Sequence, residues 1–351
     1  MRRISATRTG ARELEECRSE GGNGKRGPLV LVRLISPGYT GRSRAARGEE
    51  QARDKGGCNI LAYLAGWGMY SALMATASRW QSCATADGSF TLLQTSLGQA
   101  CHSEAGAWTE SVERYARATR LREVASRIVA ADGAARPLRL LDVGTGVGWN
   151  IAAAALELES APIELEVLSL ESDRSVLEVA LELPASGPSQ ADDARRSWLR
   201  AGLDSIASGE SQAVDWGAGC AGRIELRLGD ATQTLRDEAS TRLFDAVFLD
   251  PFSPAVDPPL WGADFLRQVA LCMAPGSWLS TYTASLSVRA RLKAAGLRVG
   301  PGPRVGDKAQ GTLASPDMDP GAFDARTERK LARRVTAELQ TGNGGAESHA
   351  S

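Results

Sequence analysis

An apolar segment that ends on an acidic residue is the part of this sequence most able to support chemistry. Residues 244–249 are apolar apart from Asp245, and they run directly into Asp250, Pro251 and Phe252. This pattern predicts a buried strand with one carboxylate at its end and a rigid turn behind it. In open α/β sheets, ligands bind just beyond the carboxyl ends of the strands. Asp250, Pro251 and Phe252 are therefore the candidate catalytic residues.

A glycine-rich turn follows a second apolar segment about 100 residues upstream. The segment 138–143 leads into Gly144, Gly146 and Gly148, with Asp142 just before them and Asn150 just after. Glycines allow a tight turn and a close approach of the backbone to a ligand. The spacing lacks the G-x-G-x-x-G fingerprint, and a carboxylate there would repel a pyrophosphate but suits a sulfonium or an amino group. We expect these five residues to bind a nucleotide-type cofactor; a purely structural turn is the alternative.

Two more acidic residues end predicted strands. Glu171 follows the segment 163–170, where an acid can accept hydrogen bonds from both ribose hydroxyls of a nucleotide. Asp230 follows the segment 224–228 and is placed to bond an adenine amino group. A solvated strand end is the alternative for Glu171, and an N-cap of the next helix is the alternative for Asp230.

Asp250-Pro251-Phe252 resembles the Asp/Asn-Pro-Pro-Tyr/Phe loop of amino-methyltransferases, which implies methyl transfer to an amine. Such an in-line displacement needs a neutral amine whose lone pair points at the methyl carbon. A carboxylate and a backbone carbonyl fixed by proline can accept the two N–H bonds and orient that lone pair, and an aromatic ring can stack on the substrate. An N-capping Asp before a simple turn is the alternative.

The surrounding sequence predicts the elements that position these residues. From residue 138 onward, strands and helices alternate, which predicts an α/β fold with a mostly parallel, doubly wound sheet. Asp87-Gly88 predicts a β-hairpin, and helical spacing predicts one helix over residues 104–131. We expect an extension at 1–80, a hairpin and helix subdomain at 81–137, the main domain at 138–315 with an insertion at 184–222, and a polar tail at 316–351.

Composition narrows the class of protein. The formal net charge is −1, yet residues 1–56 carry 13 basic and 7 acidic residues, about +6, which leaves about −7 for the rest. The six cysteines have no C-x-x-C spacing and there are two histidines, so neither a zinc site nor a disulfide framework is expected. The uncharged run 56–78 is long enough to span a bilayer, but its four glycines and central aromatic residues make it a poor span.

Taken together, these motifs resemble the methyltransferase domain of the bifunctional tRNA 5-methylaminomethyl-2-thiouridine biosynthesis protein and its free-standing relatives. The resemblance covers residues 83–315, and the segments that carry it are 85–89, 102–110, 144–150, 170–171, 229–230, 249–254, 258–261 and 274–276. It implies a Rossmann-like class I fold and N-methylation of the 5-aminomethyl group of wobble uridine in tRNA, with S-adenosylmethionine as cofactor. Asp250 would orient the amine, while Glu171 and Asp230 would bind the cofactor.

Four residues are candidates for contact with the substrate. His102 and Glu110 lie in one of the segments that carry the resemblance, and Arg289 and Lys308 bound a basic segment that would suit phosphates. A structural histidine and a solvated basic face are the alternatives. Methylation of another amine or of a protein side chain, a non-catalytic cofactor-binding module, and a membrane-anchored protein are the rival functions. We expect a cytoplasmic protein with tRNA as its partner, without a metal and without stable membrane association.

Overall fold

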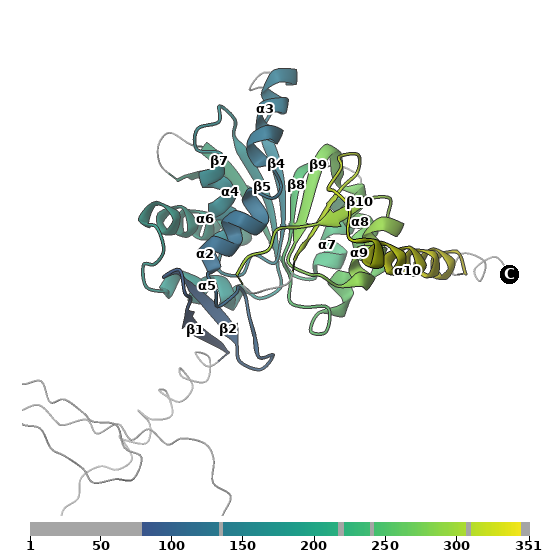
Figure 1. Cartoon of the computed structure of the whole chain (residues 1–351). Helices are drawn as coiled ribbons and strands as arrows, with labels where there is room; N and C mark the ends of the chain where they lie inside the picture. The colour runs from purple at the N-terminus through teal and green to yellow at the C-terminus, as the bar shows by residue number, and fades with distance from the viewer. Residues whose placement is uncertain (1–78, 133–135, 217–220, 239–241, 307–309, 345–351) are drawn as a thin grey trace, which may run out of the picture. The chain divides into compact units, whose positions relative to one another are not determined.

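A computed structural model describes residues 79–132, 136–216, 221–238, 242–306 and 310–344 (Figure 1). Within these residues, the central sheet contains eight strands. All of them belong to the unit Asn59–Ser351. The strands are β4 (Leu138–Val143), β5 (Leu165–Glu171), β6 (Gln212–Asp215), β7 (Ala221–Leu228), β8 (Phe244–Leu249), β9 (Met273–Thr281), β10 (Arg298–Pro301) and β11 (Thr312–Ser315).

Their order is β10-β11-β9-β8-β4-β5-β7-β6. The five central strands are parallel, and antiparallel strands complete both edges. The predicted α/β class with a mostly parallel sheet is confirmed. The strand order reverses at β4, whose two neighbours are β5 and β8. A crevice at the carboxyl ends of β4 and β8 is therefore the expected place for a ligand.

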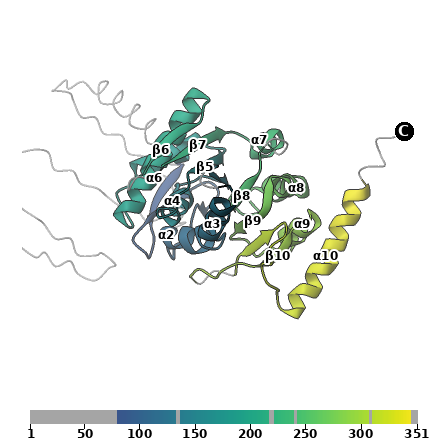
Figure 2. The ribbon, with the colours of Figure 1, turned by 90° about the horizontal axis from the view of Figure 1, so that it is seen from above.

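Helices cover both faces of the sheet (Figures 1 and 2). Alternate strand residues enter different cores: Leu140 packs with the first face and Leu141 with the second. This alternation is what a strand covered on both sides requires. The first face is covered by α3 (Leu121–Asp132), α4 (Trp149–Glu157), α5 (Arg174–Glu182) and α6 (Ser189–Ser208), and the second by α7 (Ala231–Glu238), α8 (Ala263–Leu271) and α9 (Leu286–Ala294). A last helix, α10 (Ala325–Gly344), packs on α9.

A small antiparallel sheet precedes the main one, and it confirms the predicted hairpin. It consists of β1 (Trp80–Ala84), β2 (Phe90–Gln94) and β3 (Gln99–Ala100). The carboxylate of Asp87 in the turn accepts hydrogen bonds from the backbone N–H groups of Ser89 and Thr109 at 3.1 and 2.8 Å. The turn is thereby tied to the following helix. Strand β1 begins at Trp80, the last residue of the segment that we expected to be an extension.

The prediction of one helix over residues 104–131 is wrong. The segment divides into α2 (Ala107–Glu110), a π-helix η1 (Ser111–Ala116) and α3. A turn at Arg120, with φ of 53°, separates η1 from α3. Its guanidinium lies 4.3 Å from the ring centroid of Trp278, a long-range contact that helical periodicity does not reveal. Single π-helical turns are frequent at functional sites.

Two further segments contain short strands that we did not predict. The predicted insertion 184–222 contains the 20-residue helix α6 and the edge strand β6, both of which pack on β7. The basic segment 289–308 contains β10, which pairs with β11 at the sheet edge. We did not predict β10 and β11, because each has only four residues. In addition, β10 runs into a Gly-Pro-Gly-Pro sequence that is typical of loops.

No helix within the described ranges combines the length and apolar character that crossing a membrane requires. The uncharged run 56–78 lies outside those ranges.

Candidate active site

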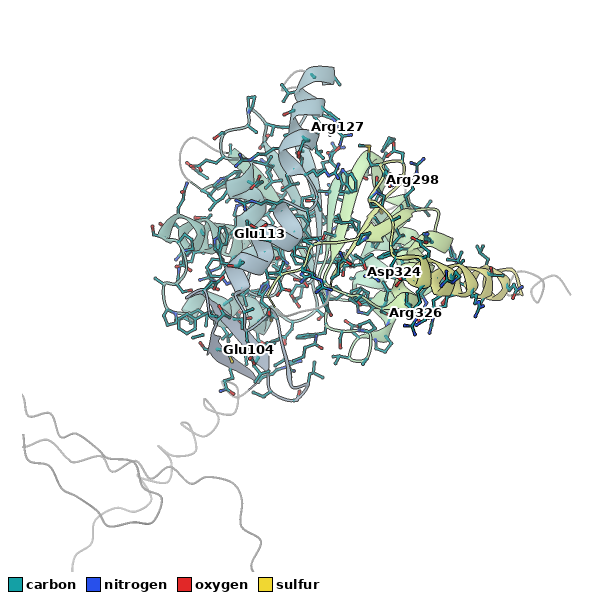
Figure 3. The ribbon with its side chains drawn as sticks, in the orientation of Figure 1. Glu104, Glu113, Arg127, Arg298, Asp324 and Arg326 are labelled. Carbon is teal, nitrogen blue, oxygen red and sulfur yellow. The ribbon has the colours of Figure 1, made fainter. Side chains whose placement is uncertain are left out.

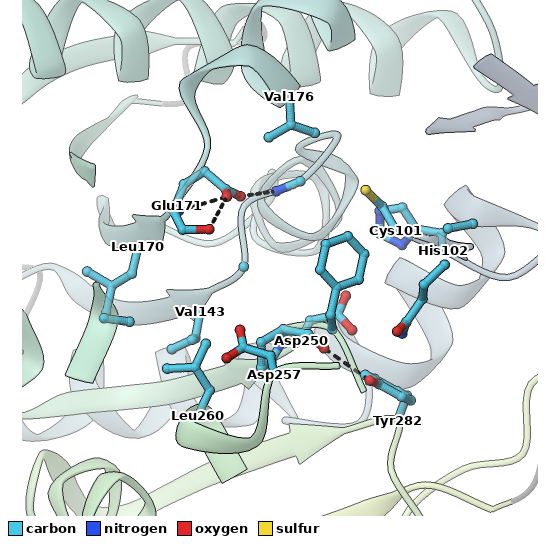
Figure 4. Close-up of a pocket in the computed structure, with 18 of the residues that line it drawn as sticks. Cys101, His102, Val143, Leu170, Glu171, Val176, Asp250, Asp257, Leu260 and Tyr282 are labelled. Atoms are coloured by element: carbon cyan, nitrogen blue, oxygen red, sulfur yellow. Dashed lines mark hydrogen bonds between the residues drawn. The ribbon is translucent and has the colours of Figure 1, made fainter. Parts of the chain in front are cut away.

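A cleft of about 510 Å³ opens at the carboxyl ends of β4, β5 and β8 (Figure 4). Its volume is in the usual range for small-molecule and cofactor sites. The lining includes residues from the hairpin sheet, the strand ends and the short helix η3 (Pro258–Trp261). Nine of the predicted site residues line it: His102, Glu110, Gly144, Gly146, Glu171, Asp230, Asp250, Pro251 and Phe252.

Gly144 lets two strand ends meet closely at the floor of this cleft. Its φ is +89°, and a Cβ atom built there would lie 2.7 Å from the backbone carbonyl oxygen of Asp250. Only glycine fits this position without strain. Gly148 has another function: it starts α4 in the left-handed conformation and packs against Leu199, outside the cleft lining.

Glu171 is held by backbone groups on two sides. Its Oε2 accepts from Gly146 N at 3.0 Å, and its Oε1 accepts from the N–H groups of Ser172 and Asp173 at 2.8 and 3.0 Å. Burial raises the pKa of Glu171, and these bonds to the ionised form partly offset that effect. The carboxylate is thereby fixed at the cleft wall, where it is able to accept hydrogen bonds from a ligand's hydroxyls.

Asp142 lies beneath the glycine turn and outside the cleft lining. It is fully buried, and its Oδ2 accepts from Ser169 Oγ at 2.7 Å. Burial raises its pKa to about 7, with the hydrogen bond from Ser169 acting in the opposite direction. Its placement supports a role in holding the turn, not a direct contact with a ligand.

Asp230 bonds to the start of the next helix and also lines the cleft. Its Oδ1 accepts from the backbone N–H and the hydroxyl of Thr232, each at 2.8 Å, at the start of α7. It lines the cleft together with Asp257. Burial raises the pKa of Asp257, and the charge of Asp230 raises it further.

Asp250 is the centre of a hydrogen-bonded network at the end of β8. Tyr115 donates its hydroxyl to Oδ1, and Asn150 Nδ2 donates to Oδ2 at 2.7 Å. Ser111 Oγ in turn donates to Asn150 Oδ1 at 2.7 Å, so that Asn150 is oriented for this bond. Burial raises the pKa of Asp250 well above its ordinary value, and the nearby carboxyl of Glu110 adds to the shift.

The turn after Asp250 is fixed by side chains from distant elements. Tyr282 donates its hydroxyl to the Pro251 carbonyl at 3.0 Å, and Trp261 Nε1 donates to the Phe252 carbonyl at 2.7 Å. The Phe252 ring stacks on Trp80 of β1, with ring centroids 6.3 Å apart and planes 18° apart. The hairpin sheet therefore forms one wall of the cleft.

His102 lies across the cleft from Glu171 (Figure 4), and Glu110 also lines the cleft. Glu110 Oε2 accepts from Ser103 N at 2.7 Å, and its Oε1 forms a buried ion pair with Arg114 Nε at 3.1 Å. These bonds keep the 102–110 segment against η1.

Arg289 is not brought to the cleft. Its buried guanidinium donates to Thr312 Oγ1 at 2.9 Å and to the carbonyls of Gln310 and Gly311, and it lies over the Phe323 ring. The side chain thus holds the β11 edge, and this placement lends no support to a contact with phosphate. Lys308 lies outside the described residues.

The cleft lining is acidic. Five of its side chains carry a carboxyl group: Glu110, Glu171, Asp230, Asp250 and Asp257. No Lys or Arg within the described ranges lines the cleft. Such a surface favours a cationic ligand and repels phosphate groups. Among the described residues, no three His, Cys, Asp or Glu side chains converge as a metal site would require.

Sequence reasoning missed several residues of the site. Tyr115 lies in the segment 104–131 that we expected to be one helix, and Tyr115, Tyr282, Asp257 and Trp261 had no assigned role. Trp80 lay in the segment that we expected to be a dispensable extension. Apart from Trp261, which lies in the resemblance segment 258–261, no local motif marks these residues, because each reaches the cleft through the tertiary fold.

Known proteins share this architecture. The S-adenosyl-L-methionine-dependent methyltransferase family matches residues 206–317. A solved structure of MnmC2 from Aquifex aeolicus superposes with a TM-score of 0.58 at 26% identity, over 78% of this chain and 88% of that one. The chain is similar to the MnmC-like S-adenosylmethionine-dependent methyltransferases. The predicted cofactor and the class I methyltransferase fold are thereby confirmed.

Two curated relatives define the range of similarity. The uncharacterized protein MJ0670 of Methanocaldococcus jannaschii is 26% identical over 72% of this chain and 65% of its own length. The tRNA 5-methylaminomethyl-2-thiouridine biosynthesis bifunctional protein MnmC of Ralstonia nicotianae is 42% identical over 27% of this chain. The chain covers less than two thirds of either protein: 65% of the first and, over the matched region, 14% of the second.

The residues of the cleft fit S-adenosylmethionine. Gly144 and Gly146 line the cleft with backbone alone, and Glu171 presents a fixed carboxylate at the end of β5. The acidic lining matches the positive sulfonium and amino groups of the cofactor. Bound there, the cofactor supplies an electrophilic methyl group.

Proposed function

We propose that the protein methylates the 5-aminomethyl group of a wobble (2-thio)uridine in tRNA, with S-adenosylmethionine as methyl donor. The observation that carries this proposal is the network at Asp250. A buried carboxylate with a raised pKa lies at the cleft between Gly144 and the aromatic wall formed by Trp80 and Phe252. The names of the MnmC relatives supply the choice of tRNA as acceptor.

Asp250 is suited to receive a proton from an amine. An amine attacks a methyl carbon only through a free lone pair, so a substrate that arrives as an ammonium must lose a proton. Because burial and Glu110 raise the pKa of Asp250, its carboxylate is a stronger proton acceptor than an exposed one. Tyr115 and Asn150 each use one lone pair of the carboxylate, which leaves one on each oxygen for the substrate.

The turn behind Asp250 holds the geometry. The bonds from Tyr282 and Trp261 fix the carbonyls of Pro251 and Phe252, so the loop is ordered before the substrate arrives. The Phe252 ring, stacked on Trp80, offers a surface on which a base can lie. Positioning of this kind accounts for a large part of the rate in transfer reactions.

The test compares Asp250→Asn with a matched control, Asp264→Asn, whose side chain is exposed on α8. Purified full-length proteins are incubated with S-adenosylmethionine and tRNA bearing 5-aminomethyluridine, and the nucleosides are analysed by mass spectrometry. We expect wild type and control to add one methyl to that nucleoside. Loss of a proton acceptor should slow Asp250→Asn by about 10²–10⁴-fold, with cofactor affinity by calorimetry within a few-fold of wild type.

Two results would contradict the proposal. Full turnover in Asp250→Asn would remove this residue from the mechanism. A wild-type protein that binds the cofactor but leaves the nucleoside unmethylated would point to another acceptor. Transfer of labelled methyl groups to a protein extract, compared with bulk tRNA, would then show whether the acceptor is a protein side chain.

A further inference from the structure

The last helix carries a row of basic side chains on its outer face. In α10, Arg326, Arg329, Lys330 and Arg333 occupy positions i, i+3, i+4 and i+7, which lie on one face of an α-helix. All four are exposed. We call these four residues the basic stripe; Figure 3 labels Arg326 at its start. Residues 325–344 contain five basic and two acidic residues, so the helix has a charge of 5 − 2 = +3.

The opposite face of α10 anchors it to α9. Leu331 is fully buried, and both acidic side chains of the helix point to this interface. Glu328 pairs with Lys293 at 3.4 Å, and Glu338 pairs with Arg291 at 3.3 Å. The two acids of α10 thus pair with basic side chains of α9, and the charged residues on the outer face of α10 are all basic.

The basic stripe has no partner of its own in the described part of the chain. There, the side chains of its four residues form no hydrogen bond or ion pair, whereas the neighbouring Arg334 donates to Ser287 Oγ at 2.7 Å. Four adjacent cations repel one another, by up to about 1 kcal/mol per pair in water at contact distance. An exposed row of this kind is suited to a polyanion.

The helix is connected to the wall of the active-site cleft. Arg291, which pairs with Glu338 of α10, also donates from Nη1 to the Trp261 carbonyl at 2.8 Å. Trp261 ends η3, and Pro259 and Leu260 of the same short helix line the cleft. One arginine side chain therefore bridges α10 and the cleft wall.

We propose that the basic stripe binds the phosphate backbone of the RNA whose base enters the cleft. This inference rests on the proposed function and adds a docking surface to it. From Arg326 to Arg333 the helix rises about 10 Å, which matches about three phosphates along one strand of a duplex. A nucleic acid is favoured over a membrane surface, because interfacial helices need an exposed apolar face and Leu331 is buried against α9.

The experiment measures binding of full-length protein to a fluorescein-labelled tRNA transcript by anisotropy between 50 and 200 mM KCl. The test variant is R329Q/K330Q/R333Q. The control is R122Q/R236Q/R267Q, which removes the same charge from exposed positions on α3, α7 and α8. Each lost phosphate contact lowers the slope of log K against log salt by about 0.7–0.9. We expect the test variant to lose about 2–3 from this slope and to bind tenfold or more weakly at 100 mM salt, with the control near wild type.

Methyl transfer separates this inference from the proposed function. If both hold, the test variant should show a raised KM for tRNA, an unchanged kcat, and a wild-type rate on a free 5-aminomethyluridine nucleoside. Stripe-dependent tRNA binding without any methyl transfer would contradict the proposed function alone. Equal slopes for the test variant and wild type would overturn the docking surface. So would a variant that keeps tRNA binding but loses binding to vesicles containing phosphatidylserine, since that would assign the stripe to a membrane.

Discussion

Replacement of Asp142 by Asn should change how the stability of the protein depends on pH. Asp142 is fully buried at the end of β4, and its Oδ2 accepts one hydrogen bond, from Ser169. Its Oδ1 has no hydrogen-bond partner among the described residues. Burial of an incompletely bonded carboxylate raises its pKa from 3.8 to about 7. Folding therefore favours the protonated form of this side chain.

The sign of the effect follows from linkage. Because the folded pKa lies above the unfolded one, the stability that Asp142 contributes is fully present below about pH 4 and is lost as the pH rises through about 7. Each pH unit between the two pKa values lowers the free energy of unfolding by about 1.4 kcal/mol. Between pH 5 and pH 8 the loss amounts to about 2–3 kcal/mol. Asparagine does not titrate, so Asp142→Asn should remove this part of the pH dependence.

Urea denaturation of wild type, Asp142→Asn and Ser169→Ala at pH 5, 6, 7 and 8 measures the effect. The Asn variant should show a flatter dependence, whatever its absolute stability. Ser169→Ala removes a hydrogen bond to the charged form of Asp142, worth about 1.5–3 kcal/mol. The decline of this variant's free energy of unfolding should therefore continue to higher pH. If wild type and Asp142→Asn show the same pH dependence, Asp142 does not titrate in this range and the reasoning from burial is wrong.

Two further predictions concern the cleft. Gly144→Ala places a Cβ 2.7 Å from the Asp250 carbonyl oxygen at a φ of +89°, a strain of about 1–3 kcal/mol. This strain should lower cofactor affinity tenfold or more in calorimetry, while the circular dichroism spectrum stays unchanged. Equal affinity would mean that the turn can relax. Tyr115→Phe removes a donor that favours the ionised form of Asp250, so the pKa of Asp250 should rise. The acidic limb of the pH–rate profile should then move to higher pH. Tyr282→Phe, which loses the bond to the Pro251 carbonyl but none to Asp250, is the control, and an equal shift in both would contradict the assignment.

The sequence predicted those parts of the site that follow directly from strand ends. Gly144, Glu171 and Asp250 each come just after an apolar strand, and parallel strands bring their carboxyl ends to one edge of the sheet. Local pattern was therefore enough to predict that these residues line the same cleft. It was also enough for Asp87-Gly88, whose turn chemistry determines the hairpin.

The remainder depends on contacts between residues far apart in the chain. Tyr115 reaches Asp250 because η1 runs beside α4, and in the sequence it has the same apolar spacing as a core residue. Trp80 reaches Phe252 across 172 positions. Arg289 shows the opposite error: its charge suggested a surface role, but its guanidinium is satisfied by the carbonyls of Gln310 and Gly311 inside the β11 edge.

The separation of charge between the cleft and the basic stripe constrains how an RNA would bind. Phosphates are repelled by the five carboxyl-bearing side chains of the cleft and attracted to Arg326, Arg329, Lys330 and Arg333. A nucleotide would thus enter with its base first, while the backbone stays outside. A base that carries an aminomethyl cation gains from the same carboxylates that exclude the phosphates. The acidic cleft would then select both the part of the RNA that enters and the charge of the group that is methylated.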